Sequence, residues 1–452
     1  MSSPVAINKK FAAYPEYKDS GIEWVGDIPI NWNVLPAFAV LREECIRNLD
    51  GAETNVLSLS YGAIKQRDVE SNAGLLPESF NTYQLVNYGD IVLRLTDLQN
   101  DKRSLRVGRS TQKGIITSAY MKLVCLHQLD NRFVYQLLHS YDTTKVFYGM
   151  GGGLRQSMKF EDFRRLPVIV PPLEEQRTIA AFLDYETARI DQLIAKQQKL
   201  IELLKEKRQA VISHAVTKGL NPDVPMKDSG VEWLGQVPEH WKCSRIGWLC
   251  KVGNGMTPNR NNAEYWSEGH IPWLNSSKVN DVEVFQAEQF VTATAFAECS
   301  LPWVKVNSVI MAITGEGKTR GTTAITRIDT TINQHVAFIM PISNRIVSDF
   351  ICIWLQSHYG RIRFESEGWG STKAAITCSD IKAYPVPLPS VREQNDIVKL
   401  VKVSNLKFDN LVSKATEQVG LLRERRTALI SAAVTGKIDV RGWNASNERN
   451  SV

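Results

Sequence analysis

Residues 312–319 come closest to a catalytic motif. Their sequence, Ala-Ile-Thr-Gly-Glu-Gly-Lys-Thr, follows an apolar run and fits a relaxed phosphate-binding loop in which Ala replaces the first Gly. Such a loop must open a helix whose N-terminal amides face the phosphates. Residues 320–326 instead form a β-branched run behind a glycine, so we expect a turn and a second strand. A basic loop that touches DNA phosphate is favoured over an NTPase that uses Lys318.

The other signatures of catalysis are missing. There is no GxGxxG turn, no GxSxG elbow and no Pro-Pro-aromatic tetrapeptide of the kind that amino-methyltransferases use to hold a flipped base. The paired carboxylates at 43–44 and 174–175 are expected in helical contexts, as solvated or helix N-terminal charges. The seven histidines form no HExxH pair and the seven cysteines no CxxC pair, so we expect no catalytic residue, no metal site and no disulfide framework.

Polar and basic side chains do recur in the loops between predicted strands. Arg and Lys suit guanine edges, Asn and Gln suit adenine edges, and all four can contact phosphates. Taken singly, each residue is better explained as a solvated loop residue, but the recurrence of similar loops in both halves of the chain makes a DNA contact about as favoured. The DNA-contact candidates are Ser60, Tyr61, Lys65, Arg155, Gln156, Thr257, Asn259, Arg260, Asn275, Ser276, Lys278, Lys318, Arg320, Thr372 and Lys373.

Composition places few limits on function. The residues are 43% hydrophobic and 23% charged, which is typical of globular proteins. A chain of 452 residues is too long for a single hydrophobic core. No apolar stretch is long enough to span a bilayer, and residues 1–10 lack the apolar core of a signal peptide. A cytoplasmic protein without membrane partners is therefore expected. The net charge of +6 is compatible with nucleic acid but is too small to prove it.

An internal repeat organises the chain. Residues 18–26, Lys-Asp-Ser-Gly-Ile-Glu-Trp-Val-Gly, return almost unchanged at residues 227–235. Each half closes with a second shared set, in which Glu175-Gln176 matches Glu393-Gln394 and residues 203–208 match 421–426. The ends of the halves are thus alike, whereas their middles diverge.

Each half combines a globular part with a long helix. Short β-branched runs such as residues 90–93 and 308–311 alternate with Gly, Asn and Asp turn signals, which predicts mixed α/β domains. Each domain ends in a proline-punctuated strand, because proline prevents a helix from beginning earlier. The predicted segments are a first domain at 1–170, a first helix at 171–218, a second domain at 219–388, a second helix at 389–440 and a flexible tail at 441–452.

The helical segments carry a narrow apolar stripe and almost no Gly or Pro. At about 1.5 Å per residue, a helix of about 40 residues is roughly 60 Å long and cannot bury its stripe alone. Two such helices in one chain are expected to pair as an antiparallel coiled coil that ends near Gly219 and Gly436, although two separate surface helices remain an alternative. The residues expected to pack on the other helix or on a partner are Ile179, Leu183, Ile190, Leu193, Leu200, Leu204, Val211, Ile397, Val401, Phe408, Leu411, Leu422 and Leu429.

These features together resemble the specificity subunit of Type I restriction–modification systems. The resemblance covers nearly the whole chain: each half begins with Lys-Asp-Ser-Gly-(Ile/Val)-Glu-Trp and closes with a proline-rich strand, Glu-Gln and a long helix. Residues 370–373, Gly-Ser-Thr-Lys, look typical of the family, whereas residues 151–155 depart from it. The resemblance implies two target recognition domains that each read one half of a split DNA sequence, with the helices fixing the gap between the halves.

The resemblance also implies partners and cofactors. The partners are double-stranded DNA, two methyltransferase subunits that dock on the helices, and two restriction subunits that act as motor-nucleases. S-adenosylmethionine, ATP and Mg²⁺ are then expected on those partners and not on this chain, which is expected to be non-catalytic. A helical scaffold without specific DNA reading, and less favourably an NTPase, remain the alternatives, and the bases that are read do not follow from the sequence.

Overall fold

The structure of the chain is a computed structural model that describes residues 11–68, 79–98, 105–126, 129–150, 157–315, 317–367 and 374–444. The chain divides into two units. Unit 1 comprises residues 1–198 and 416–452, and unit 2 comprises residues 199–415. Each long helix gives one part to each unit, so unit 1 is built from both ends of the sequence.

Unit 1 is a mixed α/β domain. Its main sheet has the strand order β4-β11-β8-β9, with antiparallel pairs throughout. The elements are β1 (Tyr17–Asp19), β2 (Asp27–Pro29), β3 (Asn33–Pro36), α1 (Ala37–Val40), β4 (Leu41–Glu43), β5 (Leu57–Ser60), β6 (Ala63–Gln66), β7 (Gln84–Val86), β8 (Ile91–Leu93), β9 (Val107–Arg109), β10 (Gly114–Ile116), β11 (Met121–Cys125), α2 (Asn131–Thr143), η1 (Val146–Gly149), α3 (Phe160–Phe163), β12 (Pro167–Val170) and the start of α4 (Leu173–Lys218).

Unit 2 repeats this plan, with the sheet order β16-β23-β20-β21-β18. Its elements are β13 (Met226–Asp228), β14 (Gln236–Pro238), β15 (Lys242–Arg245), α5 (Ile246–Leu249), β16 (Cys250–Asn254), η2 (Ala263–Tyr265), β17 (Ile271–Leu274), η3 (Ser276–Asp281), β18 (Glu283–Val284), β19 (Gln289–Val291), α6 (Ala293–Glu298), β20 (Val309–Ala312), β21 (Thr323–Thr326), β22 (Thr331–Ile332), β23 (Val336–Pro341), α7 (Ser348–Ser357), α8 (Tyr359–Glu365), α9 (Cys378–Ala383), β24 (Pro385–Leu388) and the start of α10 (Val391–Val434).

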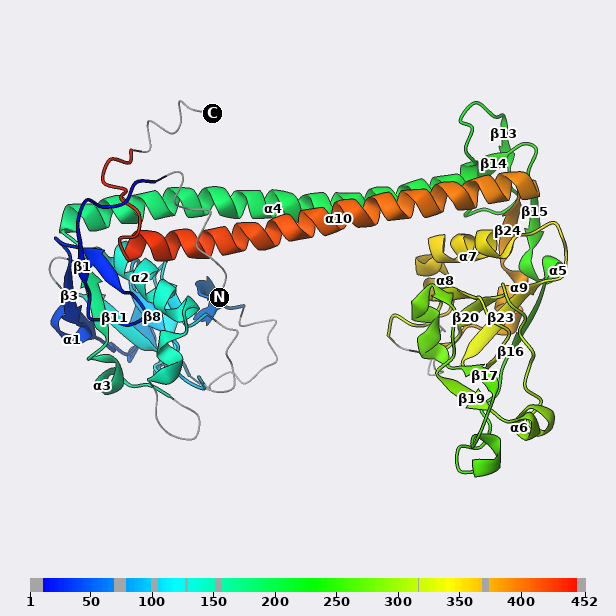
Figure 1. The fold of residues 1–452 in the computed structure, drawn as a ribbon, viewed down its shortest axis with the longest axis horizontal. Helices are drawn as coiled ribbons and strands as arrows, with labels where there is room; N and C mark the ends of the chain where they lie inside the picture. The colour runs from blue at the N-terminus through cyan, green and yellow to red at the C-terminus, as the bar shows by residue number, and fades with distance from the viewer. Residues whose placement is uncertain are drawn as a thin grey trace. The chain divides into compact units, whose positions relative to one another are not determined.

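The predicted proline-bounded strands close each domain. β12 pairs with β3, and β24 pairs with β15, so the exit of each domain lies beside its entry. The long helix begins directly after each of these strands, as expected. In Figure 1, α7 lies between α10 and the sheet of unit 2. The paired carboxylate Glu43, which the sequence suggested was in a helix, instead ends strand β4.

The repeated Glu-Gln pair joins each long helix to its domain. In both units the glutamine Nε2 donates to the carbonyl of the proline five residues earlier, at 2.8 Å for Gln176 and 3.0 Å for Gln394. The same side chain accepts through Oε1 from the amide of Asp130 (2.9 Å) or Val347 (2.8 Å), which precede α2 and α7. Both glutamines are buried. Each therefore fixes the register of a short helix against a long one.

The repeated Trp-containing motif packs on the end of a long helix. Trp32 and Trp241 are fully buried. Gly436, just after α10, has a φ of +71°, and Gly219, just after α4, has a φ of +78°. A Cβ at either glycine would lie 3.2 Å from the indole of Trp32 or Trp241. Glycine is thus required by backbone conformation and by close approach, and the predicted ends of both helices are confirmed.

Within each unit, the beginning of one long helix packs against the end of the other, so the two run antiparallel. In unit 1, Ile190 of α4 and Leu429 of α10 share one core. In unit 2, Val216 and Ile397 share another. Polar side chains also join the helices: Arg426 donates to Asp191 at 3.0 Å in unit 1, and Arg208 pairs with Asp409 at 2.7 Å in unit 2.

The seam between the helices departs from the predicted stripe in its middle. Leu193, Leu200 and Leu411 are 41%, 43% and 40% exposed, so they lie outside the seam between the two helices. Their packing on a partner, the other part of the prediction, stays a prediction. A helix pair keeps a repeat of about 3.5 residues, whereas the predicted stripe drifted from it by one position. The half-buried Ile194 and Ile201 take those places on α4. The other predicted residues are buried (Ile179, Leu183, Ile190, Ile397, Val401, Phe408, Leu429) or half-buried (Leu204, Val211, Leu422).

Part of the predicted flexible tail is ordered. Trp443 packs against Phe182 and Tyr185 of α4, with ring centroids 5.6 and 5.7 Å apart. Arg441 forms an ion pair with Asp439 at 2.6 Å. Residues 445–452 lie outside the described part. None of the helices described here has the length and apolar character needed to cross a membrane.

Candidate nucleic-acid interface

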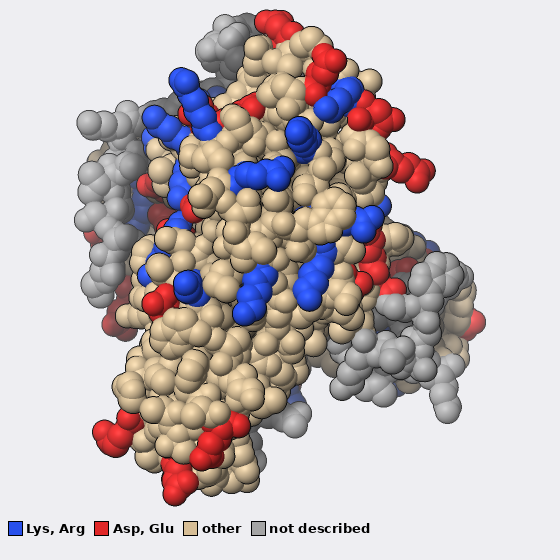
Figure 2. Space-filling model, turned by 90° about the vertical axis from the view of Figure 1, so that its right-hand side faces the viewer, with Lys and Arg blue, Asp and Glu red and all other residues tan. Residues whose placement is uncertain are grey.

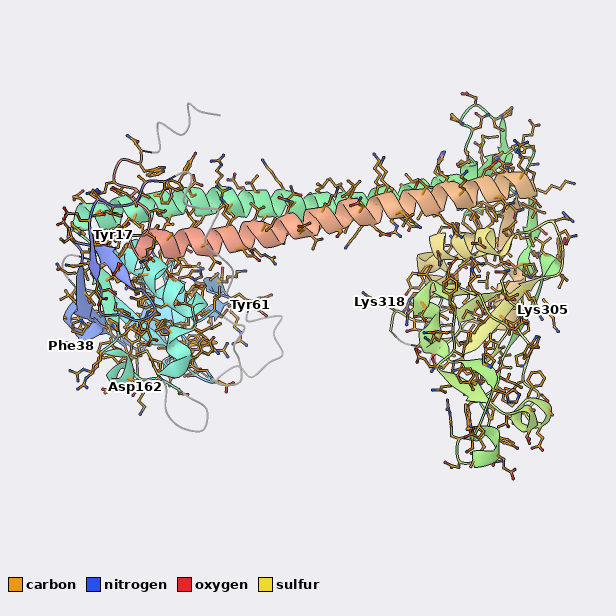
Figure 3. All side chains as sticks on the ribbon, viewed as in Figure 1. Tyr17, Phe38, Tyr61, Asp162, Lys305 and Lys318 are labelled. Atoms are coloured by element: carbon orange, nitrogen blue, oxygen red, sulfur yellow. The ribbon has the colours of Figure 1, made fainter. Side chains whose placement is uncertain are left out.

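The hairpin that contains Lys318 excludes a phosphate-binding loop. β20 and β21 are antiparallel neighbours, and a turn at residues 320–322 joins the loop to β21, so no helix follows Lys318. The Lys318 carbonyl accepts from the hydroxyl of Tyr359 at 2.6 Å, which ties the loop to α8. Its side chain is exposed, and Figure 3 places it at the opposite edge of unit 2 from Lys305. The predicted turn and second strand are therefore confirmed.

Polar side chains join three loops at one end of the unit 2 sheet. Thr314 Oγ1 lies 2.9 Å from His335 Nδ1, and His335 Nε2 lies 3.2 Å from Gln334 Nε2. Gln334 Oε1 accepts from the hydroxyl of Thr257. Because the Gln334 amide nitrogen is a donor, His335 Nε2 must accept and Nδ1 must carry the proton. We call Thr257, Thr314, Gln334 and His335 the polar edge of unit 2.

The polar edge suits the recognition of a base. Gln334 and His335 are exposed, and Thr257 and Thr314 are partly exposed. A glutamine amide held by neighbouring side chains is preorganised for two hydrogen bonds to an adenine edge. Of these four residues, only Thr257 was among the DNA-contact candidates predicted from the sequence. The available signal was their position, since each lies just after or between strands.

Arg260 is held beside the polar edge by aromatic rings. Its guanidinium carbon lies 4.0 Å from the ring centroid of Trp266 and 4.7 Å from that of Trp273. It also donates to Gln289 at 2.9 Å. The carbonyl of Asn259 accepts from the Trp266 indole at 3.1 Å. Stacking fixes the position of this cation while its face stays at the surface, so Asn259 and Arg260 belong to a rigid loop.

Three further candidates in unit 2, Asn275, Lys278 and Arg320, have intramolecular roles. Asn275 caps η3 by accepting from the amide of Ser277 at 2.9 Å, and Ser276 is the first residue of that turn. Lys278 pairs with Glu288 at 2.6 Å and Asp281 at 3.0 Å, and the hydrogen bonds that it donates to these two carboxylates raise its pKa.

Arg320 is only 2% exposed, with its guanidinium 3.7 Å from Glu367. The structure thus gives Asn275, Lys278 and Arg320 structural contacts where the sequence suggested DNA contacts. Thr372 and Lys373 lie outside the described residues, although Ala375 pairs with Thr314 of the polar edge.

In unit 1, the candidates Ser60, Tyr61 and Lys65 lie on one hairpin. Tyr61 and Gly62 form its two-residue turn with φ values of +49° and +78°, which suits the twist of the flanking strands. Tyr61 is 78% exposed at the tip, as Figure 3 shows. A non-glycine residue in this conformation is uncommon and places an aromatic ring where it could stack on a base. Arg155 and Gln156 lie outside the described residues.

The corresponding edge of unit 1 carries different side chains. The loop between β10 and β11 occupies the place of the Gln334–His335 loop. It is held by the buried Gln84, whose Nε2 donates to the carbonyls of Thr117 (3.2 Å) and Tyr120 (2.6 Å). Ser118 is exposed there. The two units therefore present different hydrogen-bonding groups on equivalent loops.

On the visible face of unit 2 (Figure 2), the basic side chains are spread rather than concentrated. On the face of unit 2 drawn in Figure 2, Lys and Arg side chains are separated by uncharged surface, and Asp and Glu gather at the lower tip. This distribution agrees with the small net charge of +6. Within the described ranges, no group of three or more His, Cys, Asp or Glu side chains is placed to hold a metal ion.

Comparison with known proteins gives a consistent result. The family model described as "Type I restriction modification DNA specificity domain" matches residues 108–203 and 238–416. The chain is 23% identical to the EcoR124I/EcoR124II specificity subunit of Escherichia coli, over 68% of this chain and 70% of that protein. It is 22% identical to the putative type I restriction enzyme MjaX specificity subunit of Methanocaldococcus jannaschii, over 92% and 96%.

Solved structures share the fold. A chain from a structure of the type I R-M system superimposes with a TM-score of 0.65 at 16% identity, covering 90% of this chain and 98% of that chain. The HsdS subunit from Thermoanaerobacter tengcongensis gives a TM-score of 0.55 at 15% identity, covering 91% and 98%. The family model alone covers more than half of the chain, and the chain therefore belongs to the family of Type I restriction–modification DNA specificity proteins.

Proposed function

We propose that this chain is the DNA sequence-recognition subunit of a Type I restriction–modification complex, in which each unit reads one half of a bipartite DNA site. The observation that supports it is that one order of four strands occurs in both sheets, to which unit 2 adds β18, while equivalent loops present different groups. In unit 2, Gln334 and His335 face solvent, whereas unit 1 offers Ser118 and the hairpin tip at Tyr61. Two readers on one frame fit a target whose halves differ in sequence.

Reading and anchoring fall to different residues in this proposal. Thr257, Gln334 and His335 form hydrogen bonds with base edges, and Tyr61 stacks or packs in the first half-site. Arg260, Lys318 and Lys65 contact phosphates, because each carries an exposed cation. Ser60 and Asn259 lie beside these contacts on the same loops.

The long helices dock the partner subunits in this proposal. In unit 2, several large apolar side chains of α4 and α10 remain exposed although the two helices already pack together. They are Leu200 (43%), Leu203 (48%), Leu400 (40%), Val403 (60%), Leu406 (72%) and Leu411 (40%). Aligned apolar groups of this kind mark a protein interface, and the partners that fit are two methyltransferase subunits, joined by two restriction subunits.

The chain supplies recognition and its partners supply chemistry in this scheme. S-adenosylmethionine belongs with the methyltransferase subunits, and ATP and Mg²⁺ belong with the restriction subunits. The complex is placed in the cytoplasm, where the seven free cysteines of this chain would stay reduced.

Exchange of one reader tests the proposal. Residues 33–170 would be replaced by the corresponding segment of another specificity subunit in the full complex, and the methylated sites would be mapped by genome-wide methylation sequencing. We expect one half-site to change and the other to stay. A change in both halves, or in neither, contradicts modular reading.

The helices are tested separately from the readers. Insertion of four residues, about one turn, near Gln197 is expected to lengthen the gap between the half-sites and leave both halves unchanged. An unaltered gap in the methylation map would rule out the spacer role. A gel-shift series of the complex against competing duplexes tests the scaffold alternative, which requires equal competition by all sequences.

A further inference from the structure

The joint between each reader domain and its long helix has the same geometry in both units. Asp130 precedes α2 and Val347 precedes α7, and their amides bind Gln176 and Gln394 at 2.9 and 2.8 Å. These hydrogen bonds define equivalent starting points on both helices of each joint. Residues at equal distances from them can be compared directly.

At equivalent positions the charges of the two joints are reversed. Arg132 is the second residue of α2, and its Nη1 lies 3.6 Å from Oδ2 of Asp184 on α4. Asp349 is the second residue of α7, and its Oδ1 accepts from Nζ of Lys402 on α10 at 2.7 Å. Asp184 and Lys402 each follow the glutamine by about two helical turns. The domain is therefore the cationic partner in unit 1 and the anionic partner in unit 2.

Neighbouring groups extend the reversal in unit 2. Glu283 of β18 lies 3.6 Å from Lys402, so two carboxylates of the domain face this lysine. Arg327 bridges the two carboxylates, at 2.5 Å from Glu283 and 3.0 Å from Asp349. Burial acts to raise the pKa of Asp349, but hydrogen bonds from Lys402 and Arg327 outweigh it and hold this pKa below the usual value.

Both joints are partly exposed. In unit 1, Arg132 is also held by Asp130 at 3.1 Å, and the side chains of Arg132 and Asp184 are 33% and 48% exposed. In unit 2, Asp349 is 17% exposed and Lys402 is 55% exposed. Burial raises the pKa of Asp184, while Arg132 and Arg109 act to lower it. Both arginines come from the domain, and so does Asp130, whose negative charge acts to raise this pKa, so the acid on α4 faces two cations and one carboxylate of the domain.

We propose that this reversed ion pair is a matching site, which favours each reader domain on its own long helix and disfavours it on the other. A copy of the first domain on α10 would bring its Arg132 against Lys402. The second domain on α4 would bring Asp349 against Asp184. Like charges at a partly buried joint lose the pairing and add repulsion. The matching site goes beyond DNA recognition, because it governs which domain can occupy which position.

The decisive test transplants a domain. In the full-length chain, residues 242–388 are replaced by residues 33–170, so that the first domain occupies both positions. Lys402→Asp is then introduced into this chimera and into the original chain, and urea unfolding is measured for all four proteins. We expect Lys402→Asp to raise the folding equilibrium constant of the chimera roughly fivefold and to lower that of the original chain by at least as much.

Opposite signs in the two chains support the matching site, and equal signs overturn it. Lys399→Asp, at an exposed position of α10, is the control for net charge and is expected to act alike in both chains. If the chimera fails to fold with either residue at 402, a double-mutant cycle in the original chain decides. Asp349→Asn and Lys402→Met should be strongly non-additive, more so than Arg132→Met and Asp184→Asn, and additivity at both joints overturns the proposal.

Discussion

Units 1 and 2 are most alike where the chain enters and leaves each domain, and least alike at the loops that face outward. Both bury a tryptophan against a glycine at a helix end, and both clamp the long helix with a glutamine. Their equivalent loops nevertheless carry Ser118 in one case and Gln334 with His335 in the other. The tryptophan–glycine contacts and the glutamine clamps are constrained by packing. The exposed loops are not, because they contribute little to the core.

Removal of the shared glutamine clamp should have the largest effect. Gln394→Ala leaves the amide of Val347 and the carbonyls of Pro389 and Arg345 without their partner, and should cost about 4 kcal/mol of unfolding free energy. Gln176→Ala breaks the hydrogen bonds to Asp130 and Pro171 and should cost a similar amount, about 4 kcal/mol. Urea denaturation measures both, with the exposed Gln418→Ala as control. Losses no larger than that control would break the claim of a common clamp.

The second-largest effect should be a loss of stability at acid pH that is greater in unit 1 than in unit 2. Burial lowers the pKa of His139 in α2 to about 4. Since this is below the unfolded value of about 6.5, the unfolded state binds more protons between these pH values. Above pH 6.5 His139 is neutral in both states and costs no stability. As the pH drops from 6.5 to 4, protonation of this histidine in the unfolded state lowers the free energy of unfolding by up to about 3 kcal/mol.

The matched variant for this prediction is His139→Gln, because Gln356 stands at the equivalent position of α7. The variant should lose most of this acid sensitivity in urea unfolding at pH 7, 5.5 and 4.5. His358 of unit 2, whose pKa burial also lowers, should keep its smaller contribution in both proteins. An unchanged pH profile would mean that His139 is not the titrating group.

Neighbouring positions on α4 should differ more modestly. Ile194→Ala removes a half-buried side chain from the seam and should cost about 1.5 kcal/mol, whereas Leu193→Ala should cost less than about 0.5 kcal/mol because Leu193 is 41% exposed. Thermal unfolding measures the difference. Equal losses of stability would mean that Leu193 packs in the seam, as the sequence predicted.

A partner contact is tested at Leu411, which is also exposed. In the complex, Leu411→Ala should weaken binding of the methyltransferase subunit.

The smallest effect is expected at a phosphate contact. Lys318→Ala should weaken DNA binding of the complex by about the same factor for every sequence and reduce the salt dependence of log K by about one unit. Gln334→Ala should instead relax specificity in one half-site, which costs about 1–3 kcal/mol for the preferred base. Titrations at several salt concentrations distinguish the two. A sequence-dependent loss at Lys318 would reassign it from phosphate to base.

Much of the fold was predictable from repetition and periodicity, since the turn glycines, proline-bounded strands and helix ends depend on local sequence. The polar edge was not, because it joins side chains that are far apart in sequence, such as Thr257 and Gln334. The contacts of Arg320 with Glu367 and of Lys278 with Glu288 were not predictable for the same reason. The one-residue shift of the seam reflects the supercoil that two helices adopt only together.

The contact of each Trp motif with the end of the other half's helix has a topological consequence. Tyr17 donates to the carbonyl of Gly436 at 3.0 Å, and the amide of Asp439 donates to the carbonyl of Ala12 at 2.8 Å. The first and last described segments are thus held together by hydrogen bonds, at the place that corresponds to the packing of Gly219 on Trp241. The connection between the two ends of the chain is therefore non-covalent, whereas the corresponding connection after α4 is covalent. A circular permutant opened near residue 222, with residue 444 linked to residue 11, would keep both tryptophan–glycine contacts and both glutamine clamps.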